Sequence, residues 1–155
     1  MWVEGFEPVY DSDSKVLILG SFPSVKSREE GFYYGNKQNR FWKTLELIYG
    51  EKINDSILAK KQFLLSHRLA LWDIVSSCDI EGSMDADIKN PIIAPVGLLL
   101  NNTNIETVLC NGKKSFSLFT ANFQFSIKVL CLPSTSPANV RFNIELWKNA
   151  LESYI

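Results

Sequence analysis

The chain has 155 residues, of which 46% are hydrophobic and 21% are charged, and its formal net charge is −1. This size and composition are typical of one globular domain, residues 1–155, and they exclude a low-complexity or largely disordered chain. The near-neutral charge excludes binding to nucleic acid through the basicity of the whole chain.

Apolar runs alternate with helical patterns along the chain. The runs expected to form strands are Lys15–Leu19, Ala70–Ile74, Thr107–Cys110 and Ile127–Leu132. Helical patterns cover Phe41–Tyr49, Ile57–Leu65, Pro91–Asn101, Lys113–Asn122 and the stretch from Pro137 to the C-terminus, whereas the polar stretch Ser76–Asn90 is expected to be a loop. Strands that alternate with helices predict an α/β fold, a three-layer α/β/α sandwich with a central, mostly parallel four-stranded sheet.

A turn of small residues, Gly20-Ser21-Phe22-Pro23-Ser24, follows the first predicted strand. Ligands of open α/β sheets bind at the carboxyl ends of the strands, so this turn is expected to lie at a binding site. Three consecutive aromatic residues, Phe32 to Tyr34, come next, and Asn39 stands just before the first predicted helix. A close backbone, aromatic rings and an amide suit the binding of a planar base better than that of a phosphate.

Two segments resemble motifs of the uracil-DNA glycosylase superfamily. The pattern Gly20-x-x-Pro23-Ser24, followed by an aromatic pair and by Asn39-x-Phe41-Trp42, is similar to the first motif of that superfamily. Leu132–Ala138 is similar to its late loop, which enters DNA. The hypoxanthine-DNA glycosylase subfamily is the most similar one, and three further stretches fit it: Leu71–Val75, Glu81–Ser83 and Asn111–Lys114.

The resemblance implies the same three-layer sandwich and a monofunctional DNA glycosylase of base-excision repair. Such an enzyme hydrolyses the N-glycosidic bond of a deaminated base, here hypoxanthine first, with uracil or xanthine as alternatives. DNA that contains deaminated bases is then the expected partner. Two other classes stay open: a non-catalytic module that binds damaged DNA, and a hydrolase that acts on free nucleosides.

The resemblance implies that Asn39 is the catalytic residue. An amide can orient a water through its oxygen and donate a hydrogen bond through its nitrogen. Asparagine directly before a helix is also a preferred N-cap, and the two roles are compatible. Phe22 stands where many uracil enzymes carry Asp or Asn, which favours the hypoxanthine type. Asn36 and Lys37 replace the usual His-Pro of the subfamily, and Lys37 keeps a Schiff-base lyase step open.

The residues expected to bind the base are Gly20, Ser21, Phe22, Tyr34 and Asn111. The resemblance implies that the Tyr34 ring stacks on the extruded base, and stacking of this kind tolerates different bases. An amide at Asn111 can pair with the Watson–Crick edge of the base. Each has an ordinary alternative, because the Tyr34 ring could belong to the core and the pair Asn111-Gly112 is favoured in turns.

The residues expected to contact DNA are Pro23, Ser24, Arg40, Ser134, Thr135, Ser136 and Pro137. The hydroxyl groups can donate to phosphates, and the turn between Pro133 and Pro137 can act as a wedge. The alternative is that Ser136 caps a helix with Pro137 in its first turn, a role compatible with phosphate binding at the helix N-terminus. Further local basic residues are Arg28, Lys37, Lys113, Lys114 and Arg141.

No metal and no organic cofactor are expected. Three cysteines cannot supply the four ligands of an iron–sulfur cluster, and the chain has one histidine, His67. Core packing is the expected role of Cys110 and Cys131. No apolar run is long enough to cross a membrane and nothing at the N-terminus resembles a signal peptide, so a cytoplasmic monomer is expected.

Overall fold

The computed structural model describes residues 1–155. Four strands form a parallel sheet in the order β3-β2-β6-β7. They are β2 (Val16–Gly20), β3 (Leu69–Asp73), β6 (Thr107–Asn111) and β7 (Lys128–Leu132). The four predicted strands and the α/β class are therefore confirmed.

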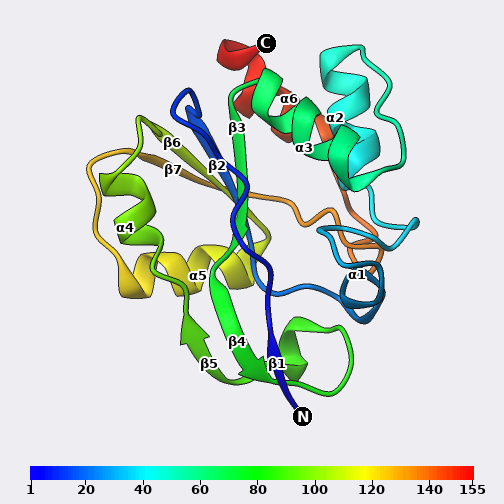
Figure 1. Ribbon diagram of the computed structural model, residues 1–155, viewed down its shortest axis with the longest axis vertical. Helices are drawn as coiled ribbons and strands as arrows, with labels where there is room; N and C mark the ends of the chain where they lie inside the picture. Colours follow the sequence, from blue (N-terminus) through cyan, green and yellow to red (C-terminus); the bar gives the residue numbers. More distant parts are fainter.

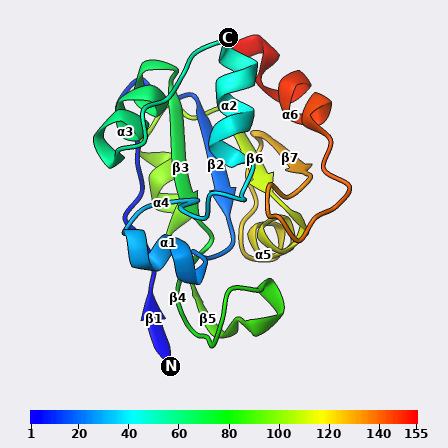
Figure 2. The same ribbon diagram turned by 90° about the vertical axis from the view of Figure 1, so that its right-hand side faces the viewer.

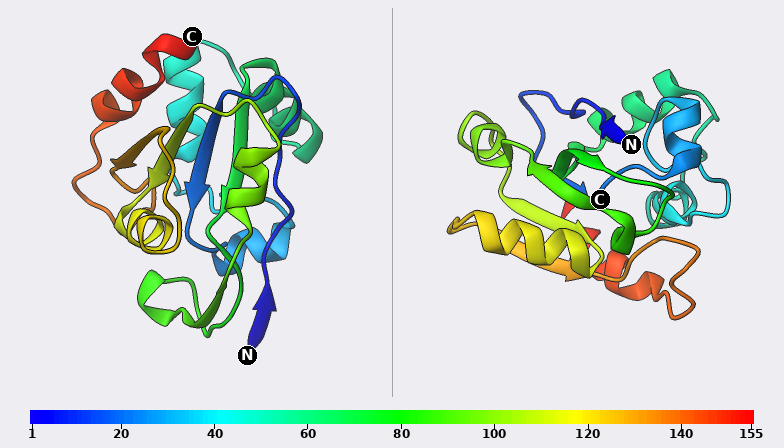
Figure 3. Two further views of the ribbon diagram at one scale, coloured as in Figure 1. Left: turned by 90° about the vertical axis from the view of Figure 1, so that its left-hand side faces the viewer. Right: turned by 90° about the horizontal axis from the view of Figure 1, so that it is seen from below.

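Helices cover both faces of this sheet, so the predicted three-layer sandwich is also confirmed. One face carries α2 (Phe41–Tyr49), α3 (Ile57–Ser66) and α6 (Ile144–Leu151), and the other carries α4 (Val96–Asn101) and α5 (Lys113–Asn122). The first set lies on the near side in Figure 2, and the second set lies on the near side in the left panel of Figure 3. The longest helices have ten residues, fewer than a bilayer crossing requires.

The alternation of side chains along β2 explains how one short apolar run serves two cores. Val16 and Ile18 pack into the cluster beneath α2, α3 and α6, whereas Leu17 and Leu19 pack into the cluster beneath α4 and α5. All four side chains are fully buried. A strand buried on both faces reads as a continuous apolar run, and this is why the sequence identifies it.

A second, antiparallel sheet lies below the first in Figure 1, in the order β1-β4-β5. Its strands are β1 (Trp2–Glu4), β4 (Val75–Asp79) and β5 (Lys89–Ile93), and a 3-10 turn, η1 (Asp85–Asp87), lies between β4 and β5. The prediction of a loop over Ser76–Asn90 is therefore wrong at both ends. Serine and aspartate hide the strand pattern of β4, although its Ser77 and Cys78 are buried.

The helix predicted over Pro91–Asn101 is wrong in its first half. Asn90 has a φ of 51° and caps no helix, and Pro91 lies in β5, at the edge of the small sheet. An edge strand tolerates proline because it can leave an N–H position unpaired. The helix α4 begins only at Val96.

Three further expectations require correction. The last helix begins at Ile144 rather than Pro137, with the Asn143 side chain accepting a hydrogen bond from the Glu145 N–H at 3.0 Å. A short helix that was not predicted, α1 (Val25–Glu30), follows the first turn and is capped by Ser24. Cys110 is buried as expected, but Cys131 is exposed, because β7 is the edge of the parallel sheet.

Candidate active site

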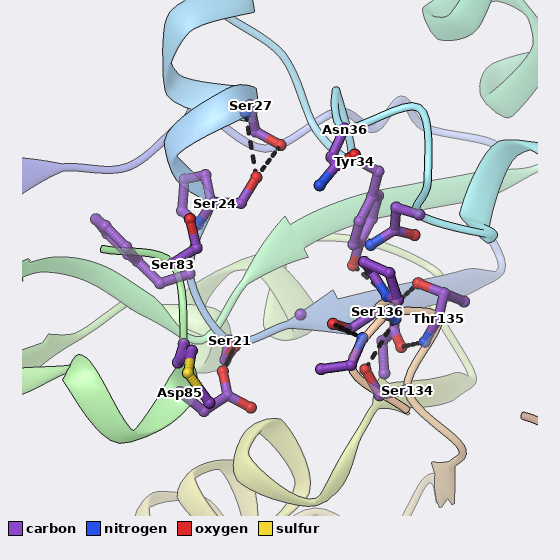
Figure 4. A pocket seen from close by; sticks show the side chains of 18 of the residues that line it. Ser21, Ser24, Ser27, Tyr34, Asn36, Ser83, Asp85, Ser134, Thr135 and Ser136 are labelled. Carbon is purple, nitrogen blue, oxygen red and sulfur yellow. Dashed lines mark hydrogen bonds between the residues drawn. The ribbon is translucent and has the colours of Figure 1, made fainter. Parts of the chain in front are cut away.

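A pocket of about 510 Å³ opens at the carboxyl edge of the parallel sheet. Its floor includes one residue from the end of each of three adjacent strands, namely Gly20, Asp73 and Asn111. Its walls are the predicted turn after β2, the segment from Tyr33 to Asn39, the turn around η1 and the loop before α6. Figure 4 shows side chains from these segments around the pocket. The structure therefore brings together the two sequence segments singled out above.

Gly20 matters here because it has no side chain. It pairs with Asp73 of β3, and a Cβ atom at this position would overlap Oδ1 of Asp73 and lie 2.7 Å from the hydroxyl oxygen of Tyr34. Any larger residue would therefore push apart the carboxyl and the ring that line the pocket. The missing side chain at Gly20 therefore lets the Asp73 carboxyl and the Tyr34 hydroxyl lie close to the backbone.

Tyr34 adopts a left-handed backbone conformation, with a φ of 53°. An aromatic residue in this region is strained, and such strain persists only where neighbouring contacts hold it. Here the Trp42 indole donates to the carbonyl of Tyr33 at 3.0 Å, and the Gly35 N–H donates to the Ser27 hydroxyl at 2.9 Å. The Tyr34 ring stacks on Phe41 at 4.1 Å between centroids and lines the pocket.

Asn39 lies just before α2, half-buried in the pocket wall. Its side-chain oxygen accepts a hydrogen bond from the Phe41 N–H at 2.9 Å, although the N-cap of α2 is Arg40 and not Asn39 as expected. The side-chain nitrogen donates to no protein group. Asn36, which replaces the usual histidine of the subfamily, fits into the loop before α2. Its side-chain oxygen accepts from the Gln38 N–H at 2.9 Å, and its backbone carbonyl accepts from the Asn39 N–H at 2.9 Å.

Asn111 is buried, and its amide is fully engaged on the nitrogen side. Its Nδ2 donates to the Tyr34 hydroxyl at 3.1 Å and to the Thr135 hydroxyl at 3.0 Å. Its Oδ1 accepts from the Thr135 N–H at 3.0 Å. Both N–H groups of the amide are bonded to protein hydroxyl groups here, so the predicted pairing of Asn111 with a base requires that one of these bonds be exchanged. In this arrangement Asn111 fastens the loop before α6 to the end of β6.

The segment from Pro133 to Asn143 is a loop, so the predicted helix start at Ser136 and Pro137 is wrong. Serine and asparagine side chains in this loop bind nearby backbone N–H groups, which competes with helix formation. The Ser134 hydroxyl accepts from the Ser136 N–H at 3.1 Å, and the Ser136 hydroxyl accepts from the Ala138 N–H at 3.2 Å. Phosphate binding at a helix N-terminus is therefore not available here.

Arg40 holds this loop in place. Its guanidinium donates to the carbonyls of Ser136 and Asn139 at 3.0 and 2.9 Å and lies over the Phe142 ring. Arg28 likewise fastens the turn before η1, because its guanidinium donates to the carbonyl of Gly82 at 2.5 Å. Both arginines, which the sequence suggested as phosphate ligands, are thus already bound to protein carbonyl groups.

The first turn and the η1 turn are joined at the pocket mouth. The Ser21 hydroxyl donates to the Asp85 carboxylate at 2.5 Å (Figure 4), and the Val25 N–H donates to the Ser83 hydroxyl at 2.8 Å. Pro23 is buried, whereas Phe22 and Ser24 are half-buried and line the pocket. No group of three or more His, Cys, Asp or Glu side chains lies close enough together to hold a metal ion.

Asp73 is the residue that sequence reasoning missed. Its side chain is 4% exposed and lines the pocket, and its Oδ2 has no hydrogen-bond partner. Burial, followed by the charge of Asp85, raises the pKa of this carboxyl from 3.8 to about 7. The signal that could have found it is an acid inside an apolar run predicted to be a buried strand, Ala70–Ile74, where a carboxyl is costly without a specific role.

The raised pKa predicts a pH-dependent stability cost. The folded state holds the Asp73 proton up to about pH 7, whereas the unfolded chain releases it near pH 4, so stability falls as the pH rises between these values. The full shift corresponds to an upper bound on the order of 4 kcal/mol. We expect Asp73→Asn to raise Tm by at least about 3 °C at pH 8 and to have little effect at pH 4. Thermal unfolding at both values tests this, and an equal Tm difference at the two would contradict it.

Comparisons with known proteins agree with this geometry. Proteins named hypoxanthine DNA glycosylase from Methanosarcina acetivorans and Methanosarcina barkeri are 36% and 34% identical over 143 and 140 residues, which is 90% and 89% of this chain and 89% of each relative. A solution NMR structure of a candidate uracil DNA glycosylase from M. acetivorans superposes with a TM-score of 0.86 at 31% identity, covering 99% of both chains. The model of the uracil DNA glycosylase superfamily matches residues 7–153. The chain belongs to the uracil DNA glycosylase superfamily.

Proposed function

We propose that this DNA glycosylase releases hypoxanthine from DNA, with uracil and xanthine as further substrates, and leaves an abasic site. One observation carries the proposal: aromatic rings and uncharged hydrogen-bond donors line a base-sized pocket beside a loop with an exposed apolar tip. The names of the two Methanosarcina relatives support hypoxanthine as the first base. The catalytic unit is proposed to be residues 1–155 as one domain.

The reaction requires groups that stabilise a base as it leaves with negative charge. Uncharged donors aimed at the developing charge do this without reorganisation. The N–H groups of Ser21 and Phe22 have no acceptor within the protein, and both residues line the pocket. The free side-chain nitrogen of Asn39 is a third donor. We assign Asn39 the catalytic role of donating to the leaving base through its nitrogen, while its oxygen can also accept a hydrogen bond from the attacking water.

Two aromatic residues of the pocket lining suit a base that has left the stack. Tyr34 has one ring face on Phe41 and contributes to the pocket wall, and Phe22 lines the pocket after β2. Stacking on an aromatic ring contributes roughly 1–3 kcal/mol per base and does not depend on which base is bound. This arrangement supports more than one deaminated base as substrate.

The loop before α6 is suited to opening the duplex. Val140 is 86% exposed, the highest value among the large hydrophobic residues, and it adjoins pocket residues 134–139. Apolar side chains that insert between base steps occur in proteins that distort DNA. We propose that Val140, rather than the turn between Pro133 and Pro137, is the wedge, because Thr135 in that turn is buried and bound to Asn111.

A panel of substrates tests the proposed function. Duplex oligonucleotides with a single inosine, uracil or xanthine site should each release free base, hypoxanthine fastest, whereas the matching free nucleosides should not react at comparable concentration. Release from nucleosides alone would indicate a nucleoside hydrolase. Binding to the oligonucleotides without release of any base would indicate a module that only recognises damage.

Replacing Asn39 separates its donor from its capping contact. Asn39→Ala should lower single-turnover base release by about 10²-fold or more, the scale of losing one oriented donor. Asn39→Asp keeps an oxygen that can accept from the Phe41 N–H, so its Tm should stay close to that of the wild type while activity is lost. If activity in both variants follows the loss of Tm, Asn39 is a capping residue only.

Val140→Ser should slow base release from duplex DNA by about tenfold and affect single-stranded DNA much less, because a wedge matters where a stack must be opened. Leu58→Ser is the matched control, since Leu58 is an exposed apolar residue of α3, 66% accessible, that does not line the pocket. Equal slowing on duplex and single strand would refute the wedge assignment.

A chain of net charge −1 should hold DNA through few phosphate contacts. Because Arg28 and Arg40 bind carbonyl groups, Lys37 and Arg141 are the expected contacts beside the pocket. The slope of log affinity against log salt should correspond to about two to four phosphates, and Lys37→Gln or Arg141→Gln should each reduce it by about one. Lys128→Gln, at the opposite end of β7, should leave the slope unchanged; a matching reduction there would indicate diffuse attraction instead.

A further inference from the structure

Asp73 is a buried acid without any of the partners that normally accompany one. Burial of a carboxylate is costly unless a cation or several hydrogen bonds compensate. No salt bridge includes Asp73, and its Oδ2 is buried with no hydrogen-bond partner. The remaining side that can supply a partner is the pocket that Asp73 lines.

Burial and the charge of one neighbouring group, Asp85, disfavour the ionised form of this carboxyl. Asp85 approaches from η1 with a negative charge, and the phenols of Tyr33 and Tyr34 approach from the segment after α1. Gly20 of β2 packs against Oδ1 without offering a side chain. No lysine, arginine or histidine lines the pocket. The pKa of about 7 follows from this desolvation and from the neighbouring Asp85.

Building on the proposed function, we propose that Asp73 binds the lactam edge of the extruded base as a neutral carboxylic acid. Its O–H donates to the carbonyl oxygen at C6 of hypoxanthine, while its C=O accepts from the N1–H. Deamination of adenine to hypoxanthine and of cytosine to uracil converts an amidine edge into this lactam edge, and xanthine carries the same N1–H and C6 carbonyl, which it keeps from guanine. The same pair of hydrogen bonds therefore serves all three bases.

The protonated form is also the one that helps the base to leave. When the N-glycosidic bond breaks, negative charge spreads over the ring to the carbonyl oxygen, and a donor at that oxygen stabilises it. An ionised carboxylate at the same place would repel that charge in a site of low dielectric constant. A carboxylic acid kept neutral by its apolar surroundings so that it can donate a hydrogen bond is an established catalytic device.

The proposal fixes a direction for the pH dependence. A group that acts in its protonated form is fully active at a pH below its pKa. Above the pKa, the rate falls tenfold for each further pH unit. We therefore expect single-turnover release of hypoxanthine from duplex DNA to be level at low pH and to fall above about pH 7. Removing the charge of Asp85 should move this fall to lower pH, because Asp85 raises the pKa of Asp73.

The experiment compares Asp73→Asn, Asp73→Ala and Asp85→Asn with the wild type, on a duplex with one inosine site, from pH 5.5 to 9. An amide offers the same donor and acceptor without titrating, so Asp73→Asn should stay within about tenfold of the low-pH wild-type rate and lose the fall above pH 7. Asp73→Ala should lose about 10²-fold at low pH. Asp85→Asn should keep the fall at a lower midpoint.

Two results would overturn the proposal: a wild-type rate that rises with pH through this range, or an Asp73→Asn variant as slow as Asp73→Ala. Either would mean that Asp73 acts as an ionised base. If Asp73→Ala fails to fold, the profiles of the wild type and Asp73→Asn still decide. A wild type that releases no hypoxanthine, uracil or xanthine at any pH refutes the proposed function itself. If the wild type releases base at pH 6 but its rate does not fall above about pH 7, only the role of Asp73 is refuted.

Discussion

The site depends on one constraint, the parallel pairing of β2 with β3 and β6. Parallel strands end at the same edge of a sheet, so residues that are 53 and 91 positions from Gly20 in the chain, Asp73 and Asn111, come to lie beside it. The in-register pair of Gly20 with Asp73 then leaves room for the Tyr34 hydroxyl only because Gly20 lacks a Cβ. The sheet thus sets both the position and the depth of the pocket.

The loops above this edge are fastened to the core by side chains of the helices and strands. Asn111 at the end of β6 binds Thr135, and Arg40 before α2 binds the carbonyls of Ser136 and Asn139. From α6, the Trp147 indole donates to the carbonyl of Pro133 at 2.8 Å. The segment proposed to enter DNA is therefore attached at its base, while its tip at Val140 is free in solvent.

The parallel sheet could be predicted because β2, β3 and β6 are buried on both faces and appear as apolar runs, and the edge strand β7 is apolar enough to be recognised beside them. The small sheet could not, since β4 contains serine and aspartate and β5 contains Pro91, which resembles the first turn of a helix. At the site, the place of Gly20 follows from the turn after a predicted strand, whereas the roles expected of Tyr34 and Asn39 come from the resemblance to the superfamily. The role of Asp73 follows from neither, because its importance lies in what is absent around it, and the absence of a partner is a property of the folded chain.

The left-handed backbone at Tyr34 has a consequence for the timing of recognition. Ser27 and Trp42 hold this conformation in the absence of DNA, so the conformational entropy of arranging the stacking ring is lost during folding and not when the base arrives. This part of the pocket is therefore already formed before any ligand binds. Under the proposed function, the rearrangement that base binding requires therefore falls on the double helix more than on the segment around Tyr34.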